Sequence, residues 1–222
     1  MEPAARGSGA PVASRLQSIV FAGPAGTLEG LLQEREAHHH TLTAVVCHPH
    51  PLHGGTLHNK VVHRVASVLH ALGAAVLRFN FRGVGASEGR FDGGEGELED
   101  ARAALAWMRV RHPRARSWAA GFSFGSWVAA GLAASEPQVE RLILVAPPVA
   151  TEDFSVLRTA AVPKLVIQGT RDDVCPGEVL AAEFPAWADP KTLIEVDGAT
   201  HFFDRELGAL ANALHQALTG AA

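Results

Sequence analysis

The 222-residue chain is 47% hydrophobic and 19% charged and has a formal net charge of -4 at pH 7, which argues against a disordered protein and against binding to nucleic acid. At this length, one domain can bury a sizeable core. No apolar run is long enough to span a bilayer and residues 1–14 lack the apolar core of a signal peptide, so we expect a cytoplasmic protein without a membrane partner. Two cysteines, Cys47 and Cys175, are too few for a disulfide framework and are expected to be reduced.

Short β-like runs alternate with amphipathic helical runs along nearly the whole chain. This pattern predicts an α/β fold, with a mostly parallel central sheet and helices on both faces. Residues 1–15 are expected to be frayed and residues 16–219 to form a single domain. The predicted strands are residues 16–22 and 28–35, which form an antiparallel hairpin at an edge, and then 41–47, 74–81, 117–120, 142–145, 162–168 and 193–196. The predicted helices are residues 58–72, 97–111, 126–135, 177–187 and 203–218.

The sequence Gly121-Phe122-Ser123-Phe124-Gly125 lies between a predicted strand and a predicted helix. A G-x-S-x-G sequence in this position predicts a sharp, strained turn that exposes the serine hydroxyl above the sheet, at the positive end of the helix. The two glycines leave room for the strand and the helix to approach each other. Ser123 is therefore the candidate nucleophile, against the alternative of an ordinary turn with a capping serine.

Two further polar residues follow predicted strands far along the chain. Asp172 comes three residues after the glycine that ends one strand, and His201 follows the last strand. Because the loops after parallel strands gather at one edge of the sheet, we expect both side chains near Ser123. A neutral histidine can take the serine proton, and an ionised aspartate can hold the imidazole in the required tautomer. The sequence therefore predicts a catalytic triad of Ser123, His201 and Asp172.

Each of the later two residues has an alternative interpretation. An aspartate in a Gly-Thr-Arg-Asp sequence often caps its own turn, and Asp173 or Asp153 is also available as the acid in place of Asp172. His201 is one of 12 histidines, most of which are expected to be solvated or packed in the core. Three suitable residue types in a suitable order at three strand ends favour the triad.

Acyl transfer also requires N–H donors for the oxyanion of the tetrahedral intermediate. The first is expected from the backbone of Phe124, at the start of the helix after the nucleophile. The second is expected from the loop after the first interior strand, where Pro49 and Pro51 have no N–H to donate. That leaves His50 or Leu52, and we favour His50.

The same loop suggests a competing hypothesis, because four histidines that are candidate zinc ligands lie close together there: His48, His50, His53 and His58. The loop has no carboxylate, and its prolines restrict the backbone between the histidines. We therefore expect no metal site and no cofactor. The Arg-Gly-Val-Gly sequence of residues 82–85 does not match a dinucleotide fingerprint, because no helix starts within it and its third glycine is misplaced.

With these residues placed, the chain resembles the α/β-hydrolase superfamily from about residue 16 to residue 218, including the chain order Ser, Asp, His. The His-Pro-His-Pro sequence of residues 48–51 and the Asn-Phe-Arg-Gly-Val-Gly-Ala-Ser sequence of residues 80–87 resemble those of small capless bacterial hydrolases related to dienelactone hydrolase. The resemblance implies an α/β-hydrolase fold without a cap domain and a cofactor-independent serine hydrolase, most often a carboxylesterase for short-chain esters. The chain departs from dienelactone hydrolases in having serine in place of the cysteine nucleophile.

Only about sixteen residues separate the predicted strands 142–145 and 162–168, where many relatives insert a helical lid. We therefore expect an open cleft and a small-molecule ester substrate, cleaved through an acyl-enzyme on Ser123 by a monomer or weak homodimer. Whether the glycine-rich, acidic residues 88–97 form a mobile lip over this cleft stays open. The alternatives are an amidase, peptidase or thioesterase with the same triad, or a catalytically idle binding module.

Overall fold

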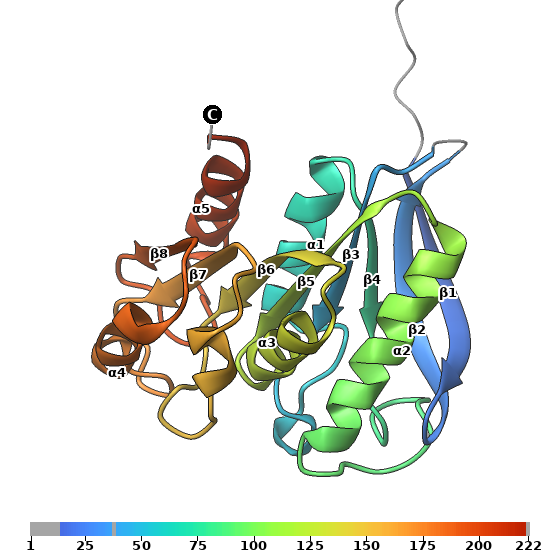
Figure 1. The fold of residues 1–222 in the computed structure, drawn as a ribbon, viewed down its shortest axis with the longest axis horizontal. Coiled ribbons are helices and arrows are strands. Elements are labelled where there is room, and N and C mark those ends of the chain that lie inside the picture. The colour runs from blue at the N-terminus through green and yellow to red at the C-terminus, as the bar shows by residue number, and fades with distance from the viewer. Residues whose placement is uncertain (1–13, 37–38, 221–222) are drawn as a thin grey trace, which may run out of the picture.

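The structure is a computed structural model that describes residues 14–36 and 39–220 (Figure 1). Eight strands form one sheet in the order β1-β2-β4-β3-β5-β6-β7-β8. The pairs from β4–β3 through β7–β8 are parallel, whereas β1–β2 and β2–β4 are antiparallel. The predicted α/β class and the antiparallel hairpin at the edge are therefore confirmed. The strands are β1 (Ser14–Gly23), β2 (Gly26–Arg35), β3 (Leu42–Cys47), β4 (Ala75–Phe79), β5 (Arg116–Phe122), β6 (Val139–Val145), β7 (Lys164–Gly169) and β8 (Lys191–Val196).

Helices cover both faces of this sheet. Figure 1 shows α2 and α3 in front of the sheet and α1 and α5 behind it. The helices are α1 (Lys60–Ala71), α2 (Glu95–Arg111), α3 (Phe124–Ser135), α4 (Gly177–Glu183) and α5 (Leu207–Thr219), with 3-10 turns η1 (Pro51–His53), η2 (Ser155–Arg158) and η3 (Phe184–Ala186). The connection from β6 to β7 contains η2 and no lid domain, so the expected capless fold is confirmed.

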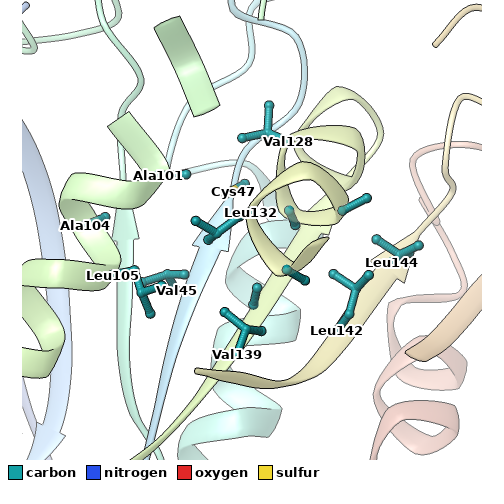
Figure 2. Packing of buried hydrophobic residues seen from close by; sticks show 14 of the residues in the cluster. Val45, Cys47, Ala101, Ala104, Leu105, Val128, Leu132, Val139, Leu142 and Leu144 are labelled. Atoms are coloured by element: carbon teal, nitrogen blue, oxygen red, sulfur yellow. The ribbon is translucent and has the colours of Figure 1, made fainter. Parts of the chain in front are cut away.

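The inner strands are buried on both sides because of this helical cover. Along β3 the side chains alternate: Ala44 and Val46 belong to the cluster under α1 and α5, whereas Val45 and Cys47 belong to the cluster under α2 and α3. Figure 2 shows the second cluster around Val45 and Cys47, with Leu132 of α3 among its members. A strand buried on both faces requires a continuous apolar run, which explains the sequence of β3.

Several element boundaries differ from the sequence-based expectations. The last helix begins at Leu207 instead of residue 203, because the chain first makes a turn in which Phe203 has a positive φ of 51°. The helix expected over residues 177–187 is α at its start only and ends at Glu183, two residues before Pro185, which has no N–H for a helical hydrogen bond. The helix after Ser123 begins at Phe124, two residues earlier than expected.

The expectation of a frayed segment at residues 1–15 falls mostly outside the described residues, which begin at Ser14. Ser14 and Arg15 belong to β1, where they pair with Arg35 and Glu34. None of the helices within residues 14–36 and 39–220 has the length and apolar character needed to cross a bilayer.

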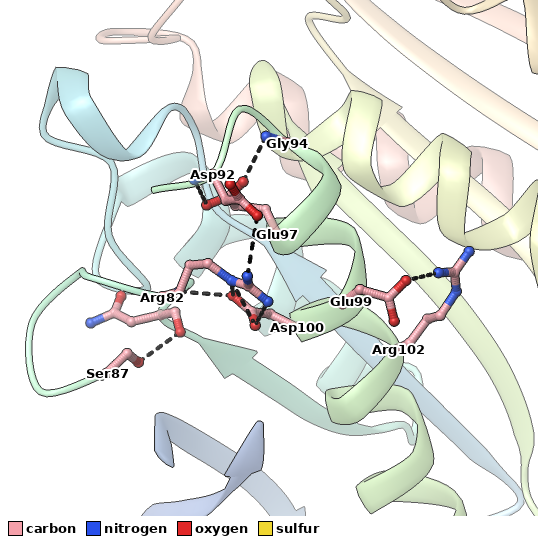
Figure 3. A network of polar contacts seen from close by, with 9 residues as sticks. Arg82, Ser87, Asp92, Gly94, Glu97, Glu99, Asp100 and Arg102 are labelled. Carbon is pink, nitrogen blue, oxygen red and sulfur yellow. Dashed lines mark hydrogen bonds and ion pairs between the residues drawn. The ribbon is translucent and has the colours of Figure 1, made fainter. Parts of the chain in front are cut away.

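Polar contacts fix the segment between β4 and α2 (Figure 3). The buried Arg82 guanidinium donates to the buried Asp100 carboxylate at 2.8 Å, and the Arg82 backbone N–H donates to the same carboxylate at 2.8 Å. Glu97 accepts from the backbone N–H groups of Asp92 and Gly94, and so caps the start of α2. The Glu97 contacts hold Asp92 and Gly94 against the start of α2, and the Arg82–Asp100 pair holds the loop after β4 against the same helix.

Candidate active site

Ser123 lies at the junction of β5 and α3, with a positive φ of 53° and a ψ of -126°. This conformation is rare for a residue with a side chain and marks local backbone strain. A Cβ atom on Gly121 would lie 2.0 Å from the Gly125 carbonyl oxygen, and one on Gly125 would lie 2.4 Å from the Cys47 carbonyl oxygen. Both positions of the G-x-S-x-G sequence therefore require glycine, for the steric reason that the sequence suggested.

The structure brings Ser123, His201 and Asp172 into one hydrogen-bonded row. Ser123 Oγ lies 3.1 Å from His201 Nε2, and His201 Nδ1 lies 2.9 Å from Asp172 Oδ2. The three side chains come from the loops that follow β5, β8 and β7, at the carboxyl edge of the sheet. Because a carboxylate can only accept, the Nδ1 atom carries the proton in this row and Nε2 accepts from the serine hydroxyl. In that tautomer the imidazole can act as a base towards Ser123.

The two carboxylate oxygens of Asp172 have different partners. Oδ1 accepts from the backbone N–H groups of Val174 at 3.0 Å and Cys175 at 2.7 Å, so it caps the turn that follows β7. Oδ2 accepts from His201 and from the side-chain amide of Gln168 at 3.1 Å. The turn-capping interpretation of Asp172 and its interpretation as the acid are both compatible with this geometry.

The two other aspartates considered for this position lie elsewhere. Asp173 is exposed. Asp153 is also exposed, and its carboxylate accepts from the backbone N–H and the hydroxyl of Ser155, each at 2.8 Å. The contact with His201 therefore distinguishes Asp172 from both.

The loop after β3 places His50 beside Phe124, with 4.9 Å between the centres of their rings. The backbone N–H of Leu52 donates to Nδ1 of His50 at 3.2 Å and is occupied by that contact. Phe124 is the first residue of α3, where a backbone N–H has no partner inside the helix. Of the two residues that the sequence left open, His50 is thus the better candidate for the second oxyanion donor.

His48, at the base of the same loop, is completely buried and uses both ring nitrogens in backbone contacts. Its Nδ1 lies 2.6 Å from the Pro49 carbonyl oxygen, and its Nε2 accepts from the Phe81 N–H at 3.1 Å. Burial lowers the pKa of His48 from 6.5 to about 4, so the ring is neutral at pH 7. His48 joins the loops after β3 and β4 and has no ring nitrogen left to bind a metal.

Among the described residues, one group has side-chain atoms close enough to share a metal ion: Asp172, Cys175 and His201. Two of them belong to the hydrogen-bonded row. Burial, and secondly the charge of Asp172, raise the pKa of the Cys175 thiol to about 12, although a hydrogen bond with Ser123 lowers it in part. Cys175 is therefore a neutral thiol beside Ser123. Cys175 and Cys47 are both free cysteines.

Aromatic side chains line the region around His50. The ring of Phe91 lies 4.9 Å from that of His50 and 6.0 Å from that of Phe124, so residues 88–97 contribute a wall to the site. Phe91 was not predicted as a site residue from the sequence. The available signal was that it is the one aromatic residue among the glycine-rich, acidic residues 88–97. On the other side, Phe202 is 45% exposed and packs edge-on against the His201 ring.

This fold and the strand ends that carry these residues define the class of α/β serine hydrolases. A family model described as "Serine aminopeptidase, S33" matches residues 44–161, more than half of the chain. The chain belongs to this family of α/β hydrolases.

Solved structures give the same result. An α/β serine hydrolase homologue from Coxiella burnetii is 41% identical over 91% of this chain and 97% of its own, with a TM-score of 0.87. A serine hydrolase without a lid from Xanthomonas campestris is 38% identical over 91% of this chain and 93% of its own, with a TM-score of 0.85. A dienelactone hydrolase from Anabaena variabilis shares the fold, with 19% identity over 91% of this chain and 96% of its own and a TM-score of 0.76. The expected membership among capless α/β hydrolases is confirmed.

Proposed function

We propose that this protein is a carboxylesterase that cleaves small or short-chain esters through an acyl-enzyme on Ser123. The observation that carries the proposal is the 3.1 Å contact between Ser123 Oγ and His201 Nε2, with Asp172 on the opposite ring nitrogen. A serine hydroxyl is a weak nucleophile until a base takes its proton, and this arrangement supplies the base and a group that orients it.

In the proposed reaction, Ser123 Oγ attacks the ester carbonyl carbon while its proton passes to His201 Nε2. Asp172 stabilises the imidazolium that forms. Collapse of the tetrahedral intermediate breaks the bond to the alcohol oxygen, which leaves with the proton from His201. A water molecule then attacks the acyl-enzyme in the same way, so that the acid is released and Ser123 regains its proton.

The backbone N–H groups of Phe124 and His50 are proposed to stabilise the oxyanion. Their side chains are in contact, and the competing Leu52 N–H is already bound to His50. In a site of this kind, each donor is worth about 3 to 4 kcal/mol in the transition state. The Phe124 donor also lies at the positive end of α3, which favours a developing negative charge.

The preference for small or exposed acyl groups is supported by the short connection between β6 and β7. The only helical element of this connection is the 3-10 turn η2, and a serine hydrolase without a lid is 38% identical to this chain. The side chain of Phe202, at the edge of the site, is half exposed. We propose that the site is open and partly apolar, which suits a small ester that needs no enclosed channel.

A second candidate is hydrolysis of peptide bonds, because the matching family is described as a serine aminopeptidase. The same nucleophile and base would serve, and the difference lies in the leaving group, which is an amine in place of an alcohol.

We also propose that the enzyme acts as a monomer or weak homodimer in the cytoplasm, where free cysteines such as Cys47 and Cys175 persist.

The test compares p-nitrophenyl esters from acetate to palmitate with aminoacyl p-nitroanilides, using wild type and Ser123→Ala. We expect the greatest kcat/KM on short esters and its loss in Ser123→Ala, while Ser135→Ala, an exposed serine at the end of α3, stays fully active. A greater kcat/KM on the anilides would replace the esterase proposal with the peptidase. Full activity of Ser123→Ala would exclude both.

A further inference from the structure

Gln168, at the end of β7, is a buried polar residue that the proposed mechanism does not use. Only 1% of its surface is exposed. Its side-chain amide nitrogen, Nε2, donates to Asp172 Oδ2 at 3.1 Å and to the Cys175 backbone carbonyl at 2.7 Å. Gln168 therefore contacts the same carboxylate oxygen that faces His201.

The chemistry of these neighbours fixes which way the amide points. A carboxylate and a carbonyl are both acceptors, so the NH₂ end of the amide must face them. The other end, Oε1, is buried and meets no donor among the described residues. A buried acceptor without a partner lowers the stability of the folded protein. An apolar side chain of similar shape would fill the same space without leaving an acceptor unpaired. Filling space therefore does not explain why an amide stands at position 168.

One of the two hydrogen bonds of Gln168 reaches Asp172 and restricts the orientation of its carboxylate. Oδ1 is already held by the turn, and Gln168 acts on Oδ2, the oxygen that His201 contacts. A second donor at Oδ2 resists rotation of the carboxylate about its Cβ–Cγ bond. It also stabilises the charge of a carboxylate that is removed from water.

We propose that Gln168 is a positioning residue for the hydrolytic reaction. Its amide holds the Asp172 carboxylate in the orientation that keeps Oδ2 on His201 Nδ1, and it acts on the rate only through Asp172. The proposal rests on the proposed function, since it requires that Asp172 and His201 work as acid and base partner. The rival explanation is a structural role, in which the bond to the Cys175 carbonyl simply anchors the loop after β7.

The first experiment replaces Gln168 by a side chain of similar shape without a donor. Gln168→Met should lower kcat on p-nitrophenyl acetate by about 10- to 100-fold, because small displacements of a reacting group have effects of that size. KM should change by less than about twofold, since substrate contacts are not touched. Gln138→Met is the control, because the Gln138 amide donates to Glu136 beyond the C-terminal end of α3, whereas Ser123 lies at the N-terminal end of this helix, and it should leave kcat unchanged.

The second experiment separates positioning from a structural role by a double-mutant cycle. Asp172→Ala alone should lower kcat by about 10⁴-fold. If Gln168 acts only through Asp172, then adding Gln168→Met in that background should change kcat by less than about twofold. If the loss of kcat in the double variant equals the product of the two single losses, positioning is contradicted and loop anchoring is favoured. Gln168→Asn, whose shorter amide cannot reach Asp172 Oδ2, provides the same cycle if Gln168→Met does not fold.

The outcomes also separate this inference from the proposed function. Activity that persists in Ser123→Ala would overturn the function, whatever Gln168 does. An inactive Ser123→Ala together with a fully active Gln168→Met would leave the function standing and overturn the positioning role alone.

Discussion

Two buried histidines at the carboxyl edge of the sheet have similar burial and different partners. His48, in the loop after β3, is fully buried, and His201, in the loop after β8, is 3% exposed. His48 contacts a backbone carbonyl and a backbone N–H, neither of which can exchange a proton with it. His201 lies between a carboxylate and a serine hydroxyl. The partners, rather than burial, separate a histidine that holds two loops together from one that is able to act as a base.

The largest effect that follows from this comparison concerns His201. His201→Gln should lower kcat by about six orders of magnitude, as expected when the base of a serine hydrolase is removed. The free energy of unfolding should stay near that of wild type. The measurement is the rate of p-nitrophenyl acetate hydrolysis together with urea unfolding, and the exposed His215→Gln on α5 is the control. Activity retained in His201→Gln would remove the distinction between the two histidines.

The next effect concerns the carboxylate that distinguishes the surroundings of His201. Asp172→Asn should lower kcat by about 10⁴-fold, because an amide can favour the wrong tautomer of the imidazole. Asp173→Asn, one residue further and exposed, should have no effect. Steady-state kinetics of both variants decide the assignment, and a larger loss in Asp173→Asn would overturn it.

The third effect is on stability and concerns His48. Its pKa falls from 6.5 to about 4 on folding, so below pH 6.5 the unfolded chain binds a proton that the folded chain does not. The stability that depends on the neutral ring is therefore complete above pH 6.5, and about 3 kcal/mol of it is lost as the pH falls towards 4. His48→Gln, whose amide can make the same two backbone contacts without titrating, should remove this part of the pH dependence. Urea unfolding between pH 4 and pH 7 measures the free energy of unfolding of both proteins. An equal pH dependence in both would show that His48 is not its source.

Removal of metal ions is expected to have no effect on the esterase rate. Both ring nitrogens of His48 are occupied by the backbone, and His201 and Asp172 contact each other. Dialysis against EDTA should therefore leave the esterase rate unchanged. An enzyme inactivated by EDTA and restored by zinc would instead support the histidine-loop metal site.

The strand ends that carry Ser123, Asp172 and His201 could be predicted from the sequence, because parallel strands place their following loops at one edge. The requirement for glycine at positions 121 and 125 could also be predicted, because the tight turn that the motif indicates leaves no room for a Cβ atom. The hydrogen bond from the Leu52 N–H to the His50 ring, which bears on the choice between these two proposed oxyanion donors, could not be predicted from the sequence.

Other features depend on contacts between distant segments, which no local pattern encodes. Gln168 looks like an ordinary strand residue until the loop after β7 folds back over it. Phe91 belongs to a segment whose composition suggests only a loop. Its place in the wall of the site depends on its packing against His50, and the next residue, Asp92, is held by Glu97 at the start of α2. The role of His48 likewise depends on Phe81, in the loop after another strand.

Ser123 is proposed as the nucleophile, in preference to the neighbouring thiol of Cys175. Acid quenching during turnover of p-nitrophenyl butyrate, followed by peptide mass mapping, would locate the acyl group directly. We expect one butyryl adduct, on Ser123, because the raised pKa of the buried Cys175 thiol keeps its sulfur protonated. An adduct on Cys175 would show that Ser123 is not the nucleophile. The same conclusion would follow if an acyl-enzyme accumulated during turnover but carried no adduct on Ser123.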